Sequence, residues 1–156
     1  MTVRFACEKD IPQMNSLLYQ VERVHQQGRP DLFKEGAKKY TGNELKAMLK
    51  DKTKPIFAAV DENDVMKGYA FCVFQEHKGD NVLTDIKTLY IDDLCIDENC
   101  RGQHIGSVLY EAVKKFAKEQ GCYNVTLNVW ECNPSARKFY EKAGLKPYKT
   151  GMEVIL

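Results

Sequence analysis

The chain has 156 residues and a formal net charge of +1, with 23 Lys and Arg residues against 22 Asp and Glu residues. This length suits one domain around one hydrophobic core, and the balanced charge argues against nucleic acid or an acidic membrane as the main partner. No apolar run reaches the roughly 18 residues of a transmembrane helix. The N-terminus lacks a signal-peptide core, so we expect a soluble cytoplasmic protein.

The N-terminal third predicts a strand followed by two helices. A short apolar run indicates a strand over residues 3–7. Asp10 can cap a helix that takes Pro12 in its first turn, and apolar residues then recur at helical spacing until just before Gly28. After a polar connection, the capping-box pattern of Thr41 and Glu44 opens a second helix, which we expect to run to residue 50.

The middle of the chain predicts an antiparallel meander. Residues 56–60 and 65–75 read as two strands, because a turn-forming cluster of Asp and Asn separates them. A polar loop then leads to a third apolar run, residues 89–96. Short connections between strands favour antiparallel pairing.

A glycine-bearing turn and an amphipathic helix follow this last strand. The turn is Arg101-Gly102-Gln103-His104-Ile105-Gly106, and Gly121 ends the helix. The first-turn N–H groups of a helix lack intrahelical partners and carry partial positive charge, so this unit can bind phosphate. The alternative is an ordinary strand–helix turn in which Gly106 only allows close packing.

The C-terminal part predicts one more helix between two strands. Residues 125–129 alternate as a strand, Asn133 caps a helix with Pro134 in its first position, and Gly144 ends it. We expect residues 146–156 to complete the sheet. The order β-α-α-β-β-β-α-β-α-β predicts an α/β protein with a mixed sheet and helices on both faces.

Two segments resemble the core of the GCN5-related N-acetyltransferase (GNAT) superfamily. The turn matches the family's acetyl-CoA loop at Arg101 and Gly106, although His104 stands where the family usually has Gly. The segment from Asn133 to Leu145 is similar to the family's Asn-x-x-Ala-x-x-Phe-Tyr-x-x-x-Gly-Phe pattern. The resemblance implies a single GNAT domain over residues 1–156, with a mixed, mostly antiparallel sheet of six to seven strands.

The resemblance also implies how acetyl-CoA would be held. The diphosphate would lie on the backbone of the glycine-bearing turn, and the pantetheine arm along the strand before it, where two strands splay apart. His104 either faces solvent or adds a phosphate contact that strengthens on protonation. The implied cofactor-binding residues are Leu94, Cys95, Ile96, Arg101, Gly102, Gln103, His104, Ile105, Gly106, Ser107, Asn133 and Tyr140.

Acetyl transfer to an amine needs a general acid for the thiolate and a base for the amine. By resemblance, Tyr140 protonates the departing sulfur in a direct attack within a ternary complex. Asp92, in a Tyr-Ile-Asp-Asp-Leu string similar to that of the spermidine/spermine acetyltransferase branch, is the better base candidate, through a water. In a regular strand Asp93 faces the other side, unless a bulge intervenes. Alternatively, both carboxylates bond only to backbone or a lysine.

The acceptor pocket of this family is built by the first two helices and their connection. His25, Arg29, Asp31 and Phe33, together with Asp93, are therefore the expected substrate-binding residues. The expected function is acetyl-CoA-dependent N-acetylation of a small-molecule amine. The alternatives are acetylation of protein N-termini or lysines, and acetyl-CoA binding without turnover. No metal site is expected, because the histidines show no ligand spacing, and a homodimer is left open.

Overall fold

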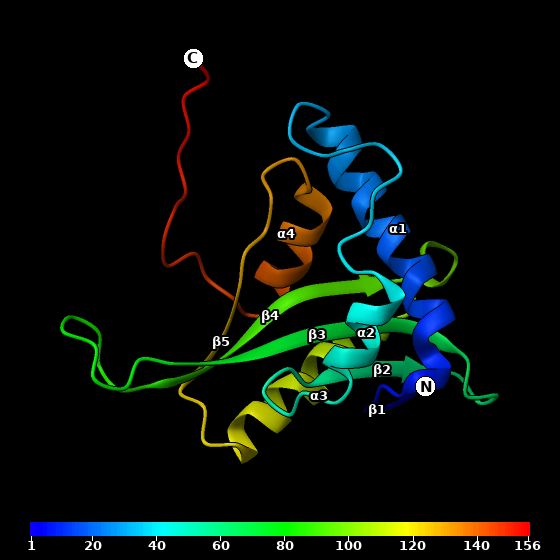
Figure 1. Cartoon of the computed structure of the whole chain (residues 1–156), viewed down its shortest axis with the longest axis horizontal. Helices are drawn as coiled ribbons and strands as arrows, with labels where there is room; N and C mark the ends of the chain where they lie inside the picture. Colours follow the sequence, from blue (N-terminus) through cyan, green and yellow to red (C-terminus); the bar gives the residue numbers. More distant parts are fainter.

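The computed structural model describes residues 1–156, which form a five-stranded sheet in the order β1-β2-β3-β4-β5 (Figure 1). The first four strands are antiparallel neighbours, and β5 runs parallel to β4. The meander is therefore confirmed. The strands are β1 Thr2–Phe5, β2 Ile56–Val60, β3 Met66–Glu76, β4 Lys87–Ile96 and β5 Asn124–Leu127.

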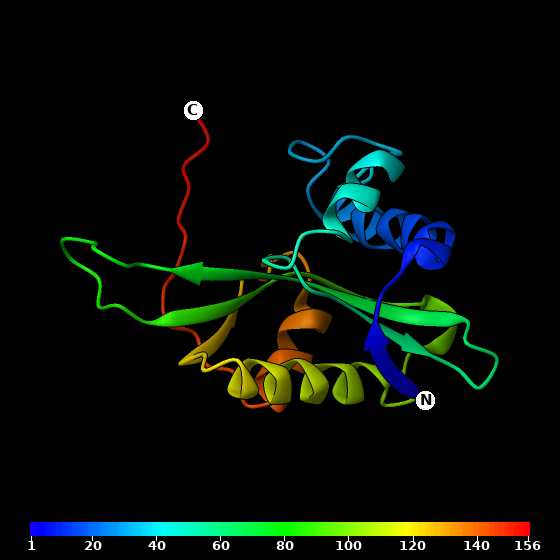
Figure 2. The same ribbon diagram turned by 60° about the horizontal axis from the view of Figure 1, so that its bottom comes forward.

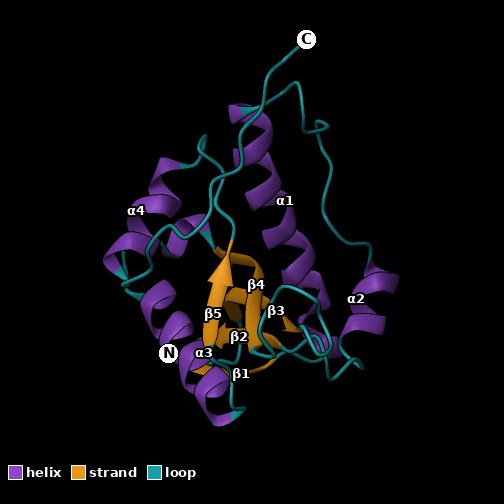
Figure 3. Cartoon of the chain, turned by 90° about the vertical axis from the view of Figure 1, so that its left-hand side faces the viewer, coloured by secondary structure: helices purple, strands orange, loops and turns teal.

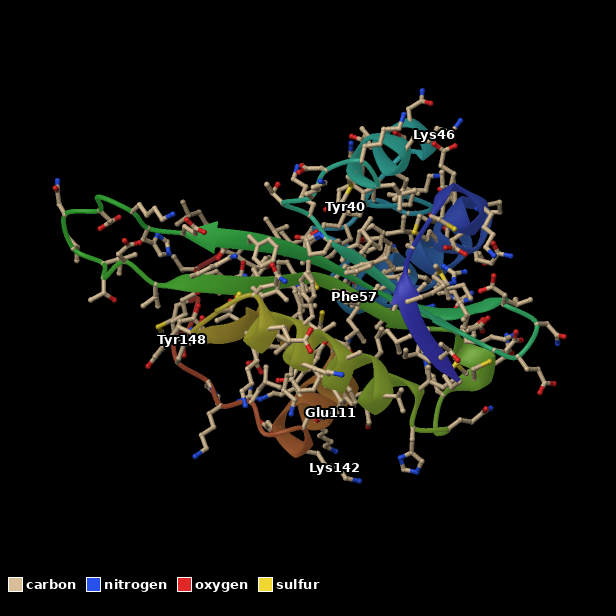
Figure 4. All side chains as sticks on the ribbon, turned by 90° about the horizontal axis from the view of Figure 1, so that it is seen from below. Tyr40, Lys46, Phe57, Glu111, Lys142 and Tyr148 are labelled. Carbon is tan, nitrogen blue, oxygen red and sulfur yellow. The ribbon has the colours of Figure 1, made fainter.

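Four helices cover the two faces of the sheet. The helices α1 and α2 lie on one face, and α3 and α4 lie on the other (Figure 2). Figure 4 shows the same division: the labelled Tyr40 lies on the α2 side, and Glu111 lies on the α3 side. The helices are α1 Ile11–Gly28, α2 Gly42–Met48, α3 Ile105–Glu119 and α4 Pro134–Lys142, with 3-10 turns η1 Glu8–Asp10 and η2 Glu98–Cys100.

Each face of the sheet has its own hydrophobic core. On the α1 side, Met14, Leu18 and Leu45 pack against Tyr69 and Phe71 of β3. On the α3 side, a second cluster of 11 buried residues joins one stripe of α3 to the opposite face of the same strands. The α3 stripe matches the helical spacing in the sequence, which is why this helix lies flat on the sheet. No helix is both long and apolar enough to cross a membrane.

The helix starts follow the sequence signals with one exception, whereas α1 includes Gly28 and α2 ends at Met48, before the expected residue 50. Thr41 and Glu44 form the expected capping box, and Asn133 accepts a hydrogen bond from the Ala136 amide at 3.2 Å. Asp10 precedes α1 but makes no cap bond to it. Its carboxylate instead accepts from the Cys7 amide at 2.8 Å and pairs with Arg4 at 2.7 Å, so it stabilises the 3-10 turn before α1.

A β-bulge interrupts β4 at Asp92. Asp93 pairs with Phe71, whereas Ile91 pairs with the next residue of β3, Cys72, so Asp92 is the extra residue. One inserted residue reverses which face the following side chains point to. Ile91 accordingly lies in the α3-side core, and Cys95 lies in the α1-side core. Both carboxylates therefore face the α1 side.

The expected sixth and seventh strands are absent, and the expectation that residues 146–156 complete the sheet is wrong. This segment forms no secondary structure and makes no backbone hydrogen bond. Its neighbour in the sheet would have to be β5, but β5 pairs only with β4 and the segment leaves the body of the protein beside it (Figure 3). The outer edge of β5 is open, but the segment does not pair with it.

Candidate active site

The N-terminus of α3 presents a run of free backbone donors. The N–H groups of residues 102–107 donate to no backbone carbonyl, and the first such bond is from Val108 to the His104 carbonyl at 3.1 Å. Aligned free N–H groups at the positive end of a 15-residue helix attract phosphate. The nearby Arg101 side chain is exposed and its Nε donates to the Ile96 carbonyl at 3.3 Å, which holds it beside the end of β4.

His104, which stands where the family usually has glycine, adopts a strained backbone conformation in the glycine-bearing turn. His104 has a φ of 60°, in the left-handed region that favours glycine, and Gly102 has a φ of 78°. A Cβ on Gly102 would meet nothing within 4 Å, so the backbone there is open to a ligand. A Cβ on Gly106 would lie 3.2 Å from Phe139, so close packing is one reason for that glycine.

Beside this turn, the pairing between β4 and β5 stops before β4 ends. The ladder between β4 and β5 ends at Ile91 and Leu127, whereas β4 continues to Ile96. The Asp97 amide donates to the Lys67 carbonyl on the β3 side, and backbone groups alternate along a strand. Leu94 and Ile96 therefore direct their N–H and C=O groups toward the open side.

Cys95, which lies between these two residues, is placed differently from a ligand-binding residue. Its side chain is buried in the α1-side core, where Sγ lies 3.5 Å from the Leu17 carbonyl. The same alternation turns its backbone toward β3. Burial raises the pKa of the Cys95 thiol to about 12. Its contribution is therefore to the core, not to the open edge of β4.

Tyr140 on α4 is partly buried and stacks edge-on against Phe139, with 5.1 Å between the ring centroids. Burial is the main reason that its pKa lies above the ordinary value of a phenol, and the negative charge of Asp93 adds to the effect. Its hydroxyl therefore keeps its proton at neutral pH, and the charge of Asp93 strengthens this effect. Asn133 uses its side chain to cap α4, as described above, so that role alone accounts for it.

Asp92 is already engaged by two neighbours. The Lys39 ammonium lies 2.9 Å from its carboxylate and also donates to its backbone carbonyl at 3.1 Å. The Tyr40 hydroxyl donates to the same carboxylate. This is the alternative in which a lysine holds the carboxylate, and it leaves little room for Asp92 to act as a base.

Asp93 has the properties that a base needs. Its carboxylate accepts one hydrogen bond, from the Tyr69 hydroxyl at 2.7 Å. Burial raises its pKa from 3.8 to about 6, and the Tyr69 bond and the Lys39 charge oppose the shift only in part. The negative charges of Asp92 and Glu22 raise it further. A carboxylate poised near neutral pH is well suited to proton transfer.

An aromatic cluster borders the site on the α1 side. The rings of His25 and Phe33 lie 5.2 Å apart, and Phe33 meets Trp130 edge-on at 5.1 Å. Burial lowers the pKa of His25, so this imidazole is neutral at pH 7. Glu22 lies one helical turn before His25, with 3.9 Å between the side chains. Two of the expected substrate-binding residues therefore meet here, and Trp130 joins them from beyond β5.

Arg29 and Asp31 are directed elsewhere. Arg29 forms a two-point ion pair with Asp31, at 2.8 and 2.9 Å, and also pairs with Glu153 near the C-terminus. Nearby, Gly28 leaves space for Cys132, because a Cβ on Gly28 would lie only 2.7 Å from the Cys132 Cβ. These contacts tie the end of α1 to the segment after β5.

Sequence reasoning missed four participants: Glu22, Tyr40, Tyr69 and Trp130. The sequence places Glu22 in a helix and Tyr69 in a strand but indicates no partner for either. Both act on Asp93, and they can do so because the bulge turns Asp93 toward the α1 side. Tyr40 comes from an irregular connection whose path the sequence does not specify. No group of three or more His, Cys, Asp or Glu side chains is arranged to hold a metal ion.

Comparison with known proteins places this geometry in a family. The sequence model of the acetyltransferase (GNAT) family matches residues 18–145 of the chain. Glucosamine 6-phosphate N-acetyltransferases are similar over a shorter part: that of Arabidopsis thaliana is 34% identical over 59 residues, and that of Candida albicans 35% over 60 residues. The match spans 38% of this chain and 38% of each of these relatives.

Solved structures match the whole chain. A mutant of the BH1408 protein from Bacillus halodurans is 28% identical, with a TM-score of 0.95 over 100% of this chain and 99% of that one. Because the match covers the whole of this chain, the likeness includes residues 146–156. An aminoglycoside acetyltransferase from a soil metagenome, in complex with sisomicin, has the same fold at 19% identity and a TM-score of 0.71, over 99% of this chain and 94% of that one.

Proposed function

Because the chain belongs to the acetyltransferase (GNAT) family, we propose that it transfers the acetyl group of acetyl-CoA to a primary amine of a small molecule, by direct attack in a ternary complex. One observation carries the proposal. A desolvated carboxylate, Asp93, lies where β4 has separated from β5, and its charge helps to raise the pKa of the protonated phenol of Tyr140. This combination of a base and an acid is what the transfer requires.

The residues beside the separated strands fit acetyl-CoA. Free N–H groups of residues 102–107 suit a diphosphate, and Gly102 leaves its approach open. The backbone of Leu94 and the N–H group of Ile96 pair with no other strand, and they suit the amide groups of a pantetheine arm. When bound, the cofactor supplies an acetyl group activated as a thioester. We assign no direct role to the side chains of Cys95 and Asn133.

Asp93, in place of Asp92, is the residue that we propose as the base. An alkylamine has a pKa of about 10.4, so it must lose a proton before it can attack. Raising a carboxylate from 3.8 to about 6 brings it about two pKa units closer to the amine, which is worth about 3 kcal/mol in proton transfer. Asp92 holds Lys39 and Tyr40, and through them the connection between α1 and α2.

Tyr140 is the residue that we propose as the acid, and its action is coupled to that of Asp93. The charge of Asp93 helps to keep the Tyr140 proton in place. Once Asp93 has accepted a proton from the amine, that charge is gone and the phenol gives up its own proton more readily. The departing sulfur then receives a proton at the moment when the amine has lost one.

The charges near Asp93 favour a cationic acceptor. The negative charges of Asp92 and Glu22 act on Asp93, and the positive charge of Lys39 opposes them. Carboxylates attract an ammonium group before it is deprotonated, and the rings of His25, Phe33 and Trp130 give its apolar part a wall to pack on. We therefore expect a small amine that carries a positive charge in solution. An N-terminal or lysine side chain of a peptide is the second candidate, because the same charges attract it.

Calorimetry with coenzyme A and a thiol-release assay test the proposal together. We expect Gln103→Glu to weaken coenzyme A binding at least tenfold, because it adds a negative charge beside the free amides. Gln120→Glu makes the same change at the opposite end of α3, where the side chain is also exposed, and should bind normally.

Three outcomes separate the alternatives. Thiol release with small amines but not with peptides supports the proposal, and the reverse favours the peptide candidate. Binding of coenzyme A without thiol release from any acceptor would indicate a non-catalytic module. Wild-type protein that does not bind coenzyme A at millimolar concentration would contradict the assignment.

A further inference from the structure

Lys39 brings a primary amine of the chain itself to the bulge of β4. Its ammonium lies 2.9 Å from the Asp92 carboxylate and donates to the Asp92 backbone carbonyl at 3.1 Å. The side chain comes from the connection between α1 and α2 and remains 35% exposed. It therefore reaches β4 from the side on which the proposed acceptor pocket lies.

The neighbours of Lys39 fix this placement. The Tyr40 hydroxyl donates to the same carboxylate, and the Tyr40 ring packs on Phe71 of the α1-side core, with 5.5 Å between the ring centroids. Lys38 turns the other way, because its ammonium donates to the side chain of Asn15 on α1 at 2.6 Å. Two lysines that are adjacent in the sequence therefore face different elements, and only Lys39 faces β4.

The Lys39 ammonium also lies near the groups that we assign to catalysis. Asp92 comes two residues before Leu94, where the backbone of β4 is open, and two residues span about 7 Å of a strand. The positive charge of Lys39 acts on Asp93, and the negative charge of Asp93 acts on Tyr140. An amine, the proposed base and the proposed acid are therefore neighbours within one chain.

We propose that Lys39 is a self-acetylation site: when acetyl-CoA is bound and no acceptor occupies the pocket, the chain transfers the acetyl group to its own Lys39. This inference rests on the proposed function and adds a second acceptor, which belongs to the chain. Such an amine needs no binding step, so it avoids the loss of translational and rotational entropy that a free amine suffers. The flexible four-carbon stem of lysine allows the ammonium to leave Asp92.

The transfer uses the acid and the base already assigned. Lys39 loses a proton to Asp93, and its neutral nitrogen then bonds to the carbonyl carbon of the thioester while the C–S bond breaks. Tyr140 gives its proton to the departing sulfur, and the second proton that the nitrogen loses restores the phenol. Asp93 returns its proton to solvent. The products are acetyl-lysine, free coenzyme A and one proton.

Acetylation changes the charges around the base. It removes the positive charge of Lys39, so Asp92 loses its ion pair. The charge that opposes the effect of Asp92 and Glu22 on Asp93 is then gone, while the Tyr69 hydrogen bond remains. The pKa of Asp93 in the acetylated chain therefore lies above its value of about 6 in the unmodified chain. The modified enzyme needs a higher pH to ionise its base.

Mass spectrometry of the chain incubated with acetyl-CoA and no added amine tests the proposal. We expect acetylation of Lys39 to be at least tenfold faster than that of Lys38, its neighbour in the sequence. Lys115 is the control for direct chemical acetylation, because its side chain is 80% exposed and should react faster than Lys39 without catalysis. Asp93→Asn and Tyr140→Phe should each slow the reaction at Lys39 at least tenfold and leave Lys115 unchanged.

Two further measurements test the route and the contact. Isotope-labelled Tyr140→Phe protein, mixed with wild-type protein, should stay unmodified at Lys39 because the transfer occurs within one chain. In cofactor-free protein, Lys39→Gln should raise the pKa of Asp93, followed by carboxyl carbon NMR, because it removes the same charge as acetylation. Lys38→Gln is the matched control and should leave that pKa unchanged.

The failure of this inference is distinguishable from the failure of the proposed function. Thiol release with small amines but no acetylation of Lys39 would overturn the inference alone, whereas no transfer to any acceptor would remove both. Acetylation that is faster at Lys115, or that Tyr140→Phe does not slow, would be chemical and would exclude self-acetylation. Modified labelled chains in the mixture would show transfer between chains, and an Asp93 pKa unaffected by Lys39→Gln would exclude the contact.

Discussion

Replacing Asp93 by Asn is expected to have opposite effects on activity and on stability. Burial raises the folded-state pKa of Asp93 above the unfolded value of 3.8, to about 6. Its favourable contribution to folding is therefore complete below about pH 4 and is lost as the pH rises through about 6. The difference of about two units corresponds to about 3 kcal/mol at neutral pH. Asn keeps an oxygen for the Tyr69 hydroxyl but carries no charge.

We accordingly expect Asp93→Asn to increase the free energy of unfolding at pH 8 by about 1–3 kcal/mol, with no increase at pH 4. The lower bound allows for the weaker hydrogen bond that Tyr69 makes to a neutral acceptor. Denaturant unfolding at the two pH values measures the difference. In the same variant, kcat should fall by about 100- to 10 000-fold, the usual contribution of a positioned base.

The wild-type pH profile gives an independent measurement of the same group. The base must be ionised to accept a proton, so kcat/KM should rise with pH through about 6 and the Asp93→Asn variant should lose this limb. Asp92→Asn is the matched control: it removes the Lys39 pair but should retain the limb.

Wild-type turnover by Asp93→Asn at pH 8 would refute the assignment of the base. Loss of turnover without any gain in stability would refute the argument from desolvation, even if Asp93 is catalytic. Loss of the pH limb in Asp92→Asn alone would return the role to Asp92.

Three further changes test other parts of the site. Tyr140→Phe should lower turnover at least tenfold while coenzyme A affinity by calorimetry stays the same, and normal turnover would exclude Tyr140 as the acid. His104→Gly should stabilise the fold by about 0.5–1 kcal/mol, because glycine adopts a φ of 60° without strain; Gln103→Gly, where φ is not positive, should destabilise it in the same denaturant series. Gly106→Ala should lower stability by about 1–3 kcal/mol through its contact with Phe139, and Phe139→Leu should recover part of the loss in thermal unfolding.

Local signals in the sequence were sufficient for most of the elements. The capping box at Thr41 and the Asn133-Pro134 start of α4 are confirmed, since such bonds involve residues only a few positions apart. Asp10 was misjudged because the same carboxylate can cap either the 3-10 turn or the helix that follows. The spacing alone did not say that Arg4, from β1, would be its partner.

The prediction of a last strand over residues 146–156 was wrong for a different reason. The apolar residues of 146–156 resemble a strand in composition, but a strand needs a neighbour to pair with. Whether one exists depends on where β5 ends and on what else reaches its edge. In the structure nothing does. Local preference cannot report whether such a neighbour is present outside the segment.

The two carboxylates show how a small backbone irregularity decides the chemistry. In a regular strand, neighbouring residues point to opposite faces, and Asp92 and Asp93 could not share a site. The bulge at Asp92 places both on the α1 side, where Lys39 and Tyr40 bind Asp92 and only Tyr69 binds Asp93. The same irregularity lies next to Ile91, where the β4–β5 ladder ends and the backbone of β4 becomes free. The open strand edge and the desolvated base therefore begin at the same irregularity of β4.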